Sequence, residues 1–168
     1  LDLYLVNEGE NRLFANDGDA VFTDVTAGAL VDPGLGRGVA AADYDGDGDV
    51  DLFVANSSTP NLLLRNESPG SGRVVQLIGT AANRAAIGAR VEAHVGDRVM
   101  VREVSGGGSY LSQNSLELHF GLVPGESIDR LVVHWNGPLG ERQVINGSAL
   151  GQEVRFQVLQ TSTSTGVD

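Results

Sequence analysis

Nine residues, from Asp43 to Asp51, constrain the fold of this chain more than any other stretch of its sequence. Aspartate occupies every second position of this segment, and glycine fills two of the four positions between the aspartates. Carboxylates spaced this closely repel one another, so a bare loop of this kind is strained. Calcium relieves that strain, because it accepts about six to eight oxygen ligands in irregular geometry, commonly from loop positions 1, 3, 5, 7 and 9 with glycine at position 6. The segment therefore predicts a calcium-binding loop.

The candidate ligands follow from counting Asp43 as position 1, which places Gly48 at position 6. Position 7 of such a loop usually donates its backbone carbonyl, so we expect a backbone oxygen from Asp49 and side-chain oxygens from the other aspartates. Magnesium suits the loop less well, because it requires tighter octahedral geometry and keeps its water ligands. An acidic Asp-Gly surface turn is the alternative interpretation. The predicted calcium ligands are Asp43, Asp45, Asp47, Asp49 and Asp51.

The residues on either side of the loop argue against an EF-hand. An EF-hand needs a bidentate glutamate at position 12 and a helix on each side of the loop, whereas position 12 here is Val54. Residues 38–42 and 52–55 are short apolar runs of the kind found in buried strands. The sequence thus predicts a metal-binding turn between two strands.

An internal repeat extends this interpretation to the first part of the chain. Residues 2–7 (DLYLVN) match residues 51–56 (DLFVAN), and residues 11–16 match residues 61–66. A period of about 50 residues made of short strands and turns is typical of propeller blades. In this register, Asp2 is equivalent to Asp51, the last aspartate of the loop.

Residues 38–54 (GVAAADYDGDGDVDLFV) resemble the FG-GAP/VCBS repeat, the calcium-binding blade unit of integrin-alpha-type β-propellers. The resemblance covers residues 1–67 and is most specific at the aspartate loop, residues 43–51. It implies about one and a third blades, while a propeller needs about four or more. We therefore expect residues 1–67 to be the C-terminal part of a β-propeller that continues upstream.

Charge divides the chain into two parts. Residues 1–68 contain 13 acidic residues and 3 arginines, whereas residues 69–168 contain 9 acidic residues and 8 arginines. A region this acidic repels nucleic acid and anionic lipid, so neither is an expected partner. No apolar run is long enough for a membrane span. The change in charge coincides with the turn-rich residues 68–72, which we expect to be a linker between two domains.

The second domain, residues 73–158, contains short runs of alternating apolar and polar residues, and Gly96-Asp97 between two of them predicts a hairpin. Such runs with frequent turns are typical of a β-sandwich or small barrel. The whole chain is thus expected to be all-β, with the polar residues 159–168 as a tail. The expected strands are residues 73–78, 89–95, 98–104, 115–120, 129–135, 142–145 and 153–158.

This second half resembles the ASPIC/UnbV family, whose domain follows VCBS repeats in secreted proteins. Trp135 is followed here by Asn-Gly-Pro, whereas the family usually continues Trp-Pro-x-Gly, so that turn departs from the pattern. The resemblance implies a secreted protein. It rests on Asn83-Arg84, Ile87–Val91, Gly108–Gln113, Leu118–Leu122 and Val133–Trp135.

Other candidate sites are weaker. His94, His119 and His134 suggest zinc, but each belongs to an alternating run, and no pair has the spacing of a local zinc motif. The chain has no cysteine and no Gly-x-Ser-x-Gly motif, which argues against a thiol enzyme or an α/β-hydrolase. The glycosylation triplets at Asn56, Asn66 and Asn146 occur often by chance and have little weight.

Together these features predict a calcium-binding, non-enzymatic adhesion or binding protein, extracellular or at the cell surface. The calcium is expected to be structural, and the ligand is an unidentified protein or glycan. Two alternatives stay open. The chain could be a subunit of an extracellular assembly that is completed by strand exchange between neighbouring chains, because unpaired strand edges accept strands. It could also be an accessory region of a secreted enzyme.

Overall fold

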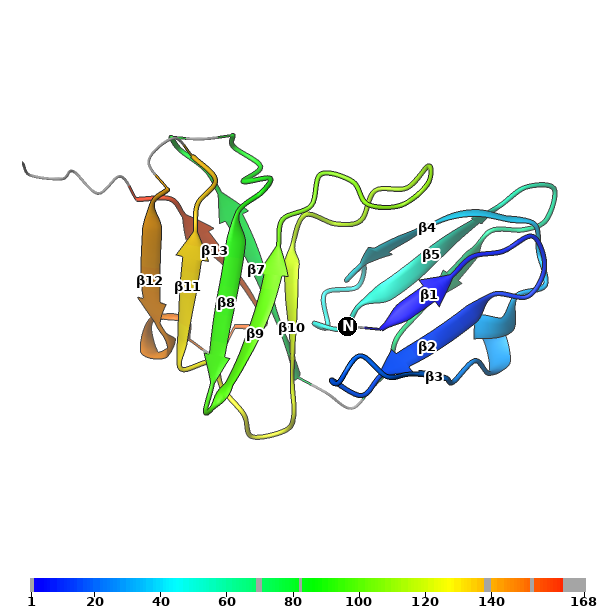
Figure 1. Ribbon diagram of the computed structural model, residues 1–168, viewed down its shortest axis with the longest axis horizontal. Coiled ribbons are helices and arrows are strands. Elements are labelled where there is room, and N and C mark those ends of the chain that lie inside the picture. The colour runs from blue at the N-terminus through cyan, green and yellow to red at the C-terminus, as the bar shows by residue number, and fades with distance from the viewer. Residues whose placement is uncertain (1, 69–70, 82, 138–139, 152, 162–168) are drawn as a thin grey trace, which may run out of the picture. The chain divides into compact units, whose positions relative to one another are not determined.

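The computed structural model describes residues 2–68, 71–81, 83–137, 140–151 and 153–161. These residues form strands and two short 3₁₀ helices, and no α-helix occurs among them (Figure 1). The all-β prediction is therefore confirmed. The chain divides into two compact units, which are described in turn. The first contains residues 1–42, 51–66 and 107–114, and the second contains residues 43–50, 67–106 and 115–168.

The first unit contains two three-stranded antiparallel sheets, each with its strands in chain order. A 3₁₀ helix, η1 (Gly28–Val31), precedes the second sheet. Gly107–Asn114 is part of this unit. There the side chains of Ser112 and Asn114 accept hydrogen bonds from the backbone N–H groups of Val39 and Ala41, at 3.0 and 2.9 Å. The strands are β1 (Leu3–Leu5), β2 (Arg12–Asn16) and β3 (Phe22–Asp24), then β4 (Gly36–Ala42), β5 (Asp51–Asn56) and β6 (Leu62–Leu64).

The two sheets repeat the same hydrogen bonds, as the sequence repeat predicts. Asp2 Oδ1 accepts the Asn16 N–H at 2.9 Å, and Asp51 Oδ1 accepts the Asn66 N–H at 2.8 Å. A second equivalent pair closes the turn after the first repeated strand: the Asn7 N–H donates to Asn11 Oδ1 at 2.8 Å, and the Asn56 N–H donates to Asn61 Oδ1 at 2.9 Å. Each sheet is thus one copy of the same blade-like unit.

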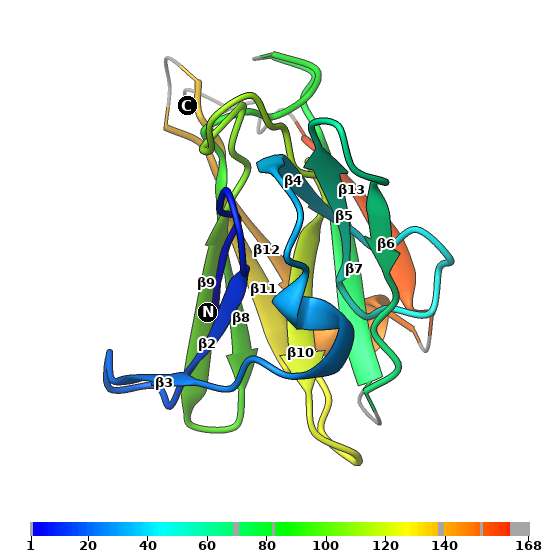
Figure 2. The ribbon, with the colours of Figure 1, turned by 90° about the vertical axis from the view of Figure 1, so that its right-hand side faces the viewer.

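The second unit packs two sheets face to face, with strand orders β10-β7-β13 and β12-β11-β8-β9 (Figures 1 and 2). Its core lies between them, where Phe120 and Val75 of one sheet join Val91 and Val133 of the other in a single buried cluster. The strands are β7 (Ser71–Ile78), β8 (Arg90–Val95), β9 (Arg98–Glu103), β10 (Leu118–Leu122), β11 (Arg130–His134), β12 (Arg142–Asn146) and β13 (Arg155–Leu159), with the 3₁₀ helix η2 (Gly147–Ala149) between the last two.

Each of the seven strands expected in this half corresponds to one observed strand. The predicted hairpin at Gly96-Asp97 joins β8 and β9, in which Val95 pairs with Arg98. Strand β10 begins at Leu118, three residues later than expected, and β7 begins at Ser71, inside the expected linker. Residues 69–70 of that linker, Pro138 of the unusual turn, and residues 162–168 of the tail lie outside the described residues. The domain boundaries at 68–72 stay a prediction.

Candidate metal centre

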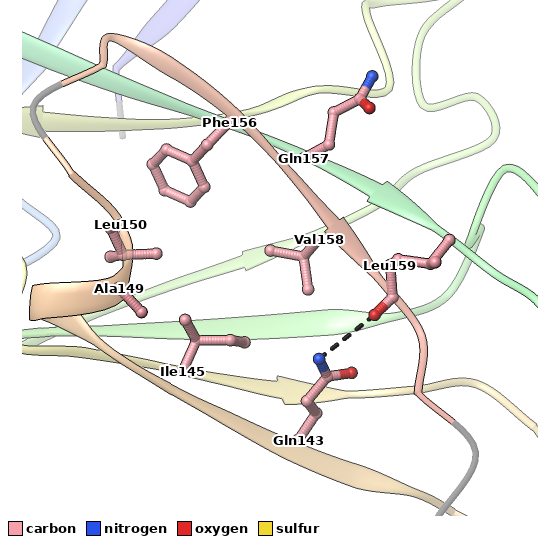
Figure 3. Close-up of a pocket in the computed structure, with 8 residues that line it drawn as sticks. All are labelled: Gln143, Ile145, Ala149, Leu150, Phe156, Gln157, Val158 and Leu159. Atoms are coloured by element: carbon pink, nitrogen blue, oxygen red, sulfur yellow. Dashed lines mark hydrogen bonds between the residues drawn. The ribbon is translucent and has the colours of Figure 1, made fainter.

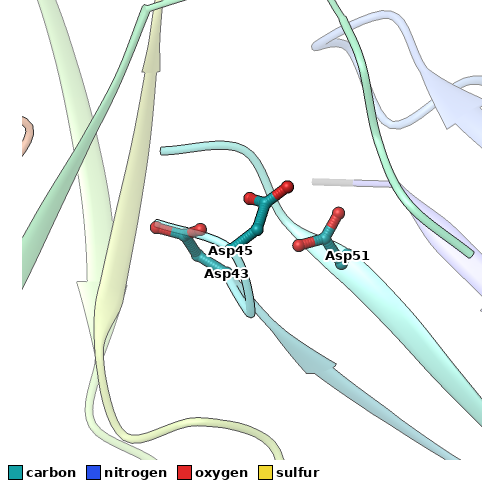
Figure 4. Close-up of side chains that lie close together, drawn as sticks. All are labelled: Asp43, Asp45 and Asp51. Atoms are coloured by element: carbon teal, nitrogen blue, oxygen red, sulfur yellow. The ribbon is translucent and has the colours of Figure 1, made fainter. Parts of the chain in front are cut away.

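The aspartate loop connects β4 to β5, and Ala42 and Asp51 at its two ends are paired residues of that antiparallel hairpin. Asp43, Asp45 and Asp51 lie close together, and one carboxylate oxygen of each lies within 4.8 Å of the other two (Figure 4). Asp43 and Asp51 are buried, at 7% and 2% exposure, while Asp45 is exposed. The loop therefore gathers three of the five predicted ligands.

Hydrogen bonds inside the loop fix the first of these carboxylates. The Gly46 N–H donates to Asp43 Oδ1 at 2.7 Å, and the Gly48 N–H donates to Asp43 Oδ2 at 3.2 Å. Both glycines have positive φ, +83° and +97°, which residues with a Cβ rarely adopt. The glycines between the aspartates thus allow the chain to curl around Asp43.

Asp47 and Asp49 lie outside the three-carboxylate cluster. Asp47 is exposed, and its Oδ1 accepts the Asp49 N–H at 2.9 Å. The Asp47 N–H in turn donates to Asp45 Oδ1 at 3.4 Å. These turns hold the loop backbone at Asp45, Asp47 and Asp49. That all five aspartates bind the metal stays a prediction.

The donor set fits a hard divalent cation. All three clustered donors are carboxylate oxygens, which is the ligand type that calcium and magnesium prefer. Burying ionised carboxylates is costly unless a cation compensates them, and two of these three are buried. A calcium ion held by Asp43, Asp45 and Asp51 would add to the compensation that their hydrogen bonds and ion pairs already provide.

The structure adds two residues that the sequence analysis did not find. Arg155 Nη2 lies 3.3 Å from Asp43 Oδ2, and its Nη1 lies 3.1 Å from Glu117 Oε1. The Asp43 side chain is fully buried at this ion pair, whereas the Arg155 side chain is 44% exposed. Arg155 follows Asp43 by 112 residues. No local pattern could have indicated this contact, because it depends on how β13 pairs in the sheet.

His119 lies in the same electrostatic environment. Burial is the main cause that lowers the pKa of His119 below its ordinary value, Arg155 and Arg102 lower it further, and Asp43 and Glu117 oppose them. Neither ring nitrogen has a hydrogen-bond partner among the described residues. A neutral imidazole is therefore favoured next to the loop.

The three histidines are distributed over the two sheets of the second unit. His94 on β8 and His134 on β11 lie beside the Glu92 carboxylate, with Nε2–O distances of 3.7 and 3.3 Å, whereas His119 is on β10 in the other sheet. Among the described residues, the three aspartates are the only group of three or more His, Asp or Glu residues whose ligand atoms all lie within 4.8 Å of one another. The structure thus gives the three-histidine zinc hypothesis no support.

A shallow cavity of about 170 Å³ opens between β12, η2 and β13 (Figure 3). Apolar side chains such as Ile145, Leu150 and Phe156 form most of its wall. Gln143 Nε2 crosses it to donate to the Leu159 carbonyl at 3.3 Å. The described lining residues include no acid, base or nucleophile, so this cavity is a weaker candidate site than the aspartate loop.

Comparison with protein families agrees with both halves of this architecture. The family model described as ASPIC and UnbV matches residues 79–163, which is about half of the chain. The chain belongs to the ASPIC and UnbV family. In this ASPIC and UnbV protein, the FG-GAP-like repeat matches residues 1–54 and the FG-GAP repeat matches residues 35–75. Both repeat matches include the aspartate loop, and the predicted propeller-blade character of this part is confirmed.

Three curated relatives share a 65-residue stretch with the chain. Cartilage acidic protein 1 is 46% identical in Homo sapiens, 45% in Mus musculus and 43% in Xenopus tropicalis. The stretch is 37% of this chain and 10% of each relative, so the chain spans about a tenth of the length of the curated relatives it matches. The described residues contain no helix of the length and apolar character that crossing a membrane requires.

Proposed function

We propose that this chain is a calcium-binding, non-enzymatic part of an extracellular binding or adhesion protein. The observation that carries the proposal is the convergence of Asp43, Asp45 and Asp51, within 4.8 Å, in a loop whose glycines permit its curled backbone. The remaining aspartates of the loop, Asp47 and Asp49, complete the proposed ligand set. Calcium acts structurally here, because it cancels carboxylate repulsion at the point where β4 turns into β5.

The extracellular location is part of the proposal and agrees with the metal chemistry. Extracellular calcium modules bind with dissociation constants of about 10⁻⁴–10⁻³ M, which suits a loop with an exposed ligand such as Asp45. FG-GAP repeats and relatives named cartilage acidic protein 1 are in keeping with that setting. The partner is a protein or glycan bound by surfaces that the two units present.

Isothermal titration of the chain with calcium chloride, and separately with magnesium chloride, tests the proposal. We expect calcium to bind with a stoichiometry near one and magnesium to bind more weakly, because it requires tighter octahedral geometry. Asp45→Asn should abolish binding, since it removes a clustered carboxylate. Asp19→Asn is the matched control, because Asp19 also lies in an exposed acidic turn but is outside the cluster. Equal binding by both variants would contradict the proposed site.

A second candidate function is favoured by how few apolar side chains the first unit buries. Among the described residues, Val54 is the only buried apolar side chain of that unit, and Leu3, Leu5, Phe53 and Leu63 are 41–51% exposed. Blade-like sheets cover such faces by packing on neighbours. Assembly with further blades, or with neighbouring chains by strand exchange, is therefore the alternative proposal. An accessory role in a secreted enzyme has no comparable observation in its favour.

A further inference from the structure

The aspartate loop and the strands that flank it belong to different units of the chain. Strand β4 and strand β5 belong to the first unit, whereas residues 43–50 group with the second unit, which contains the β10-β7-β13 sheet. The contacts of the loop within this unit are unusually close and involve residues to which the sequence gives no obvious role.

The closest of these contacts joins two glycines. A Cβ added to Gly72, near the start of β7, would lie 1.9 Å from the Gly48 carbonyl oxygen, and a Cβ on Gly48 would lie 2.9 Å from Val154 Cγ1. Real Cβ atoms do not approach other atoms this closely, so the loop backbone rests directly on the backbone of β7. Glycine at both positions is what allows this approach.

The loop is seated on the outer face of the sheet, away from the core. Side chains alternate between faces along a strand, and Val75 and Leu77 point into the core, so Gly72 and Val74 point outward. Val74 is nevertheless 0% exposed and is not part of the core cluster, so its outward side is covered. Arg155, the register partner of Val74 on β13, reaches the loop at Asp43.

We propose that the aspartate loop is a metal-dependent clamp on the β10-β7-β13 sheet, so that calcium binding stabilises the second unit. This inference rests on the proposed calcium binding. The folded sheet holds the loop in one backbone conformation through the contact between Gly48 and Gly72, and a preorganised loop binds its ion more tightly. Coupling between two equilibria is reciprocal, so the ion must stabilise the folded sheet by the same factor.

Trp135 provides the readout. It is the only tryptophan, it is 4% exposed, and it lies in the second unit, so its fluorescence reports the unfolding of that unit. We expect calcium at about 100 times its Kd to raise the Trp135-detected melting temperature by roughly 5–10 °C relative to EDTA. Asp45→Asn should remove this shift.

Two matched glycine variants separate the clamp from general effects on the sheet. Gly72 and Gly121 are register partners on β7 and β10, but a Cβ on Gly121 would meet no atom within 4 Å. Gly72→Ala should reduce calcium affinity about tenfold and remove most of the calcium-dependent shift, because the loop must lift off the strand. Gly121→Ala should behave like the unmutated chain in both measurements.

The outcomes are separable from those of the proposed function. If titration detects no calcium binding, the proposed function fails first. If calcium binds but leaves the Trp135 transition unchanged, or if Gly72→Ala keeps the full shift, the clamp is wrong and the calcium site stands. Hydrogen exchange of the unmutated chain covers the case in which Gly72→Ala does not fold. Calcium should then slow exchange in β7 and β13 more than in β12, and uniform protection would overturn the clamp.

Discussion

Asp43 combines hydrogen bonds inside the aspartate loop with an ion pair to Arg155 of β13. Its two oxygens accept the N–H groups of Gly46 and Gly48, and Oδ2 also lies 3.3 Å from the Arg155 guanidinium. A carboxylate with this many donors is held in one orientation. The orientation of Asp43, a proposed ligand, is therefore set by groups outside the proposed ligand set.

Arg155 sets the electrostatic potential that a metal ion meets. The positive charge of Arg155 repels a calcium ion at the proposed site, and Arg155→Gln removes that repulsion. The same change leaves the negative charge of Glu117 without its guanidinium partner, which also favours calcium. We expect calcium affinity to rise about threefold to tenfold at low salt, a modest effect because Arg155 is 44% exposed and screened by solvent. Isothermal titration calorimetry measures the calcium affinity of each variant.

Arg98→Gln is the control for this prediction, since Arg98 is similarly exposed, at 48%, but pairs with Glu126 at 2.6 Å instead of with Asp43. That variant should bind calcium like the unmutated chain. Weaker calcium binding by Arg155→Gln would mean that Arg155 positions Asp43 more than it repels the ion.

His119 makes the stability of the metal-free chain depend on pH. Its folded-state pKa is depressed, so protonation favours the unfolded state as pH falls through the ordinary value near 6.5. The contribution of neutral His119 to stability is complete above that value and is lost on acidification toward the folded-state pKa. In EDTA, the drop in urea stability from pH 8 to pH 5.5 should be smaller in His119→Gln than in the unmutated chain. Equal drops would show that His119 stays accessible to protons in the fold.

At the scale of the elements, the strands were predictable because burial on one face leaves a period of two in the sequence. Residues 90–95 alternate strictly, with Val91, Ala93 and Val95 buried, and the turn after them contains the glycine that the hairpin needs. The pairing of the strands was not predictable. Parallel β13–β7 pairing joins Arg155 to Val74, and nothing in either segment specifies so distant a partner.

The same distinction holds for the proposed metal centre. Its clustered aspartates lie in one local motif, so spacing alone indicated them, and it also indicated the glycines at Gly46 and Gly48. The contacts with Arg155, Glu117 and Gly72 arise only after the second unit folds. Local sequence thus indicates the proposed ligands, and tertiary packing determines the environment around them.

The buried core between the two sheets contributes most of the stability of the second unit. Phe120 on β10 is 0% exposed within the core cluster, so Phe120→Ala should cost about 3–5 kcal/mol of unfolding free energy. Val99 on β9 is 48% exposed, and Val99→Ala should cost about 0.5 kcal/mol or less. Urea titrations followed by Trp135 fluorescence measure both. Similar costs for the two variants would contradict the face-to-face packing of the sheets.

At the scale of the whole molecule, the two units differ in how far they can bury their own apolar residues. The core cluster lies entirely in the second unit, and Val54 is the one buried apolar side chain among the described residues of the first. The first unit retains its hydrogen-bonded sheets and its repeated turns but lacks an interior of its own. A repeat of this kind is stabilised mainly through its neighbours.

The last prediction concerns what covers the apolar surface of the first unit. Phe53 and Leu63 are paired across β5 and β6 and are 44% and 51% exposed, so they form a continuous apolar surface rather than isolated side chains. We expect this surface to be covered by protein outside residues 1–168, either further blades or a neighbouring copy. The chain on its own should therefore self-associate in light scattering and bind a hydrophobic dye.

Replacing Phe53 and Leu63 together by lysine should reduce both self-association and dye binding, because charge opposes burial of the face, while calcium binding stays intact. Val123→Lys is the control, since Val123 is 56% exposed in a loop of the second unit and should change neither measurement. A stable monomer of the unmutated chain that binds no dye would show that the first unit closes on itself. In that case its strands would need no neighbouring blade, and the expectation that they form the end of a longer propeller would have to be abandoned.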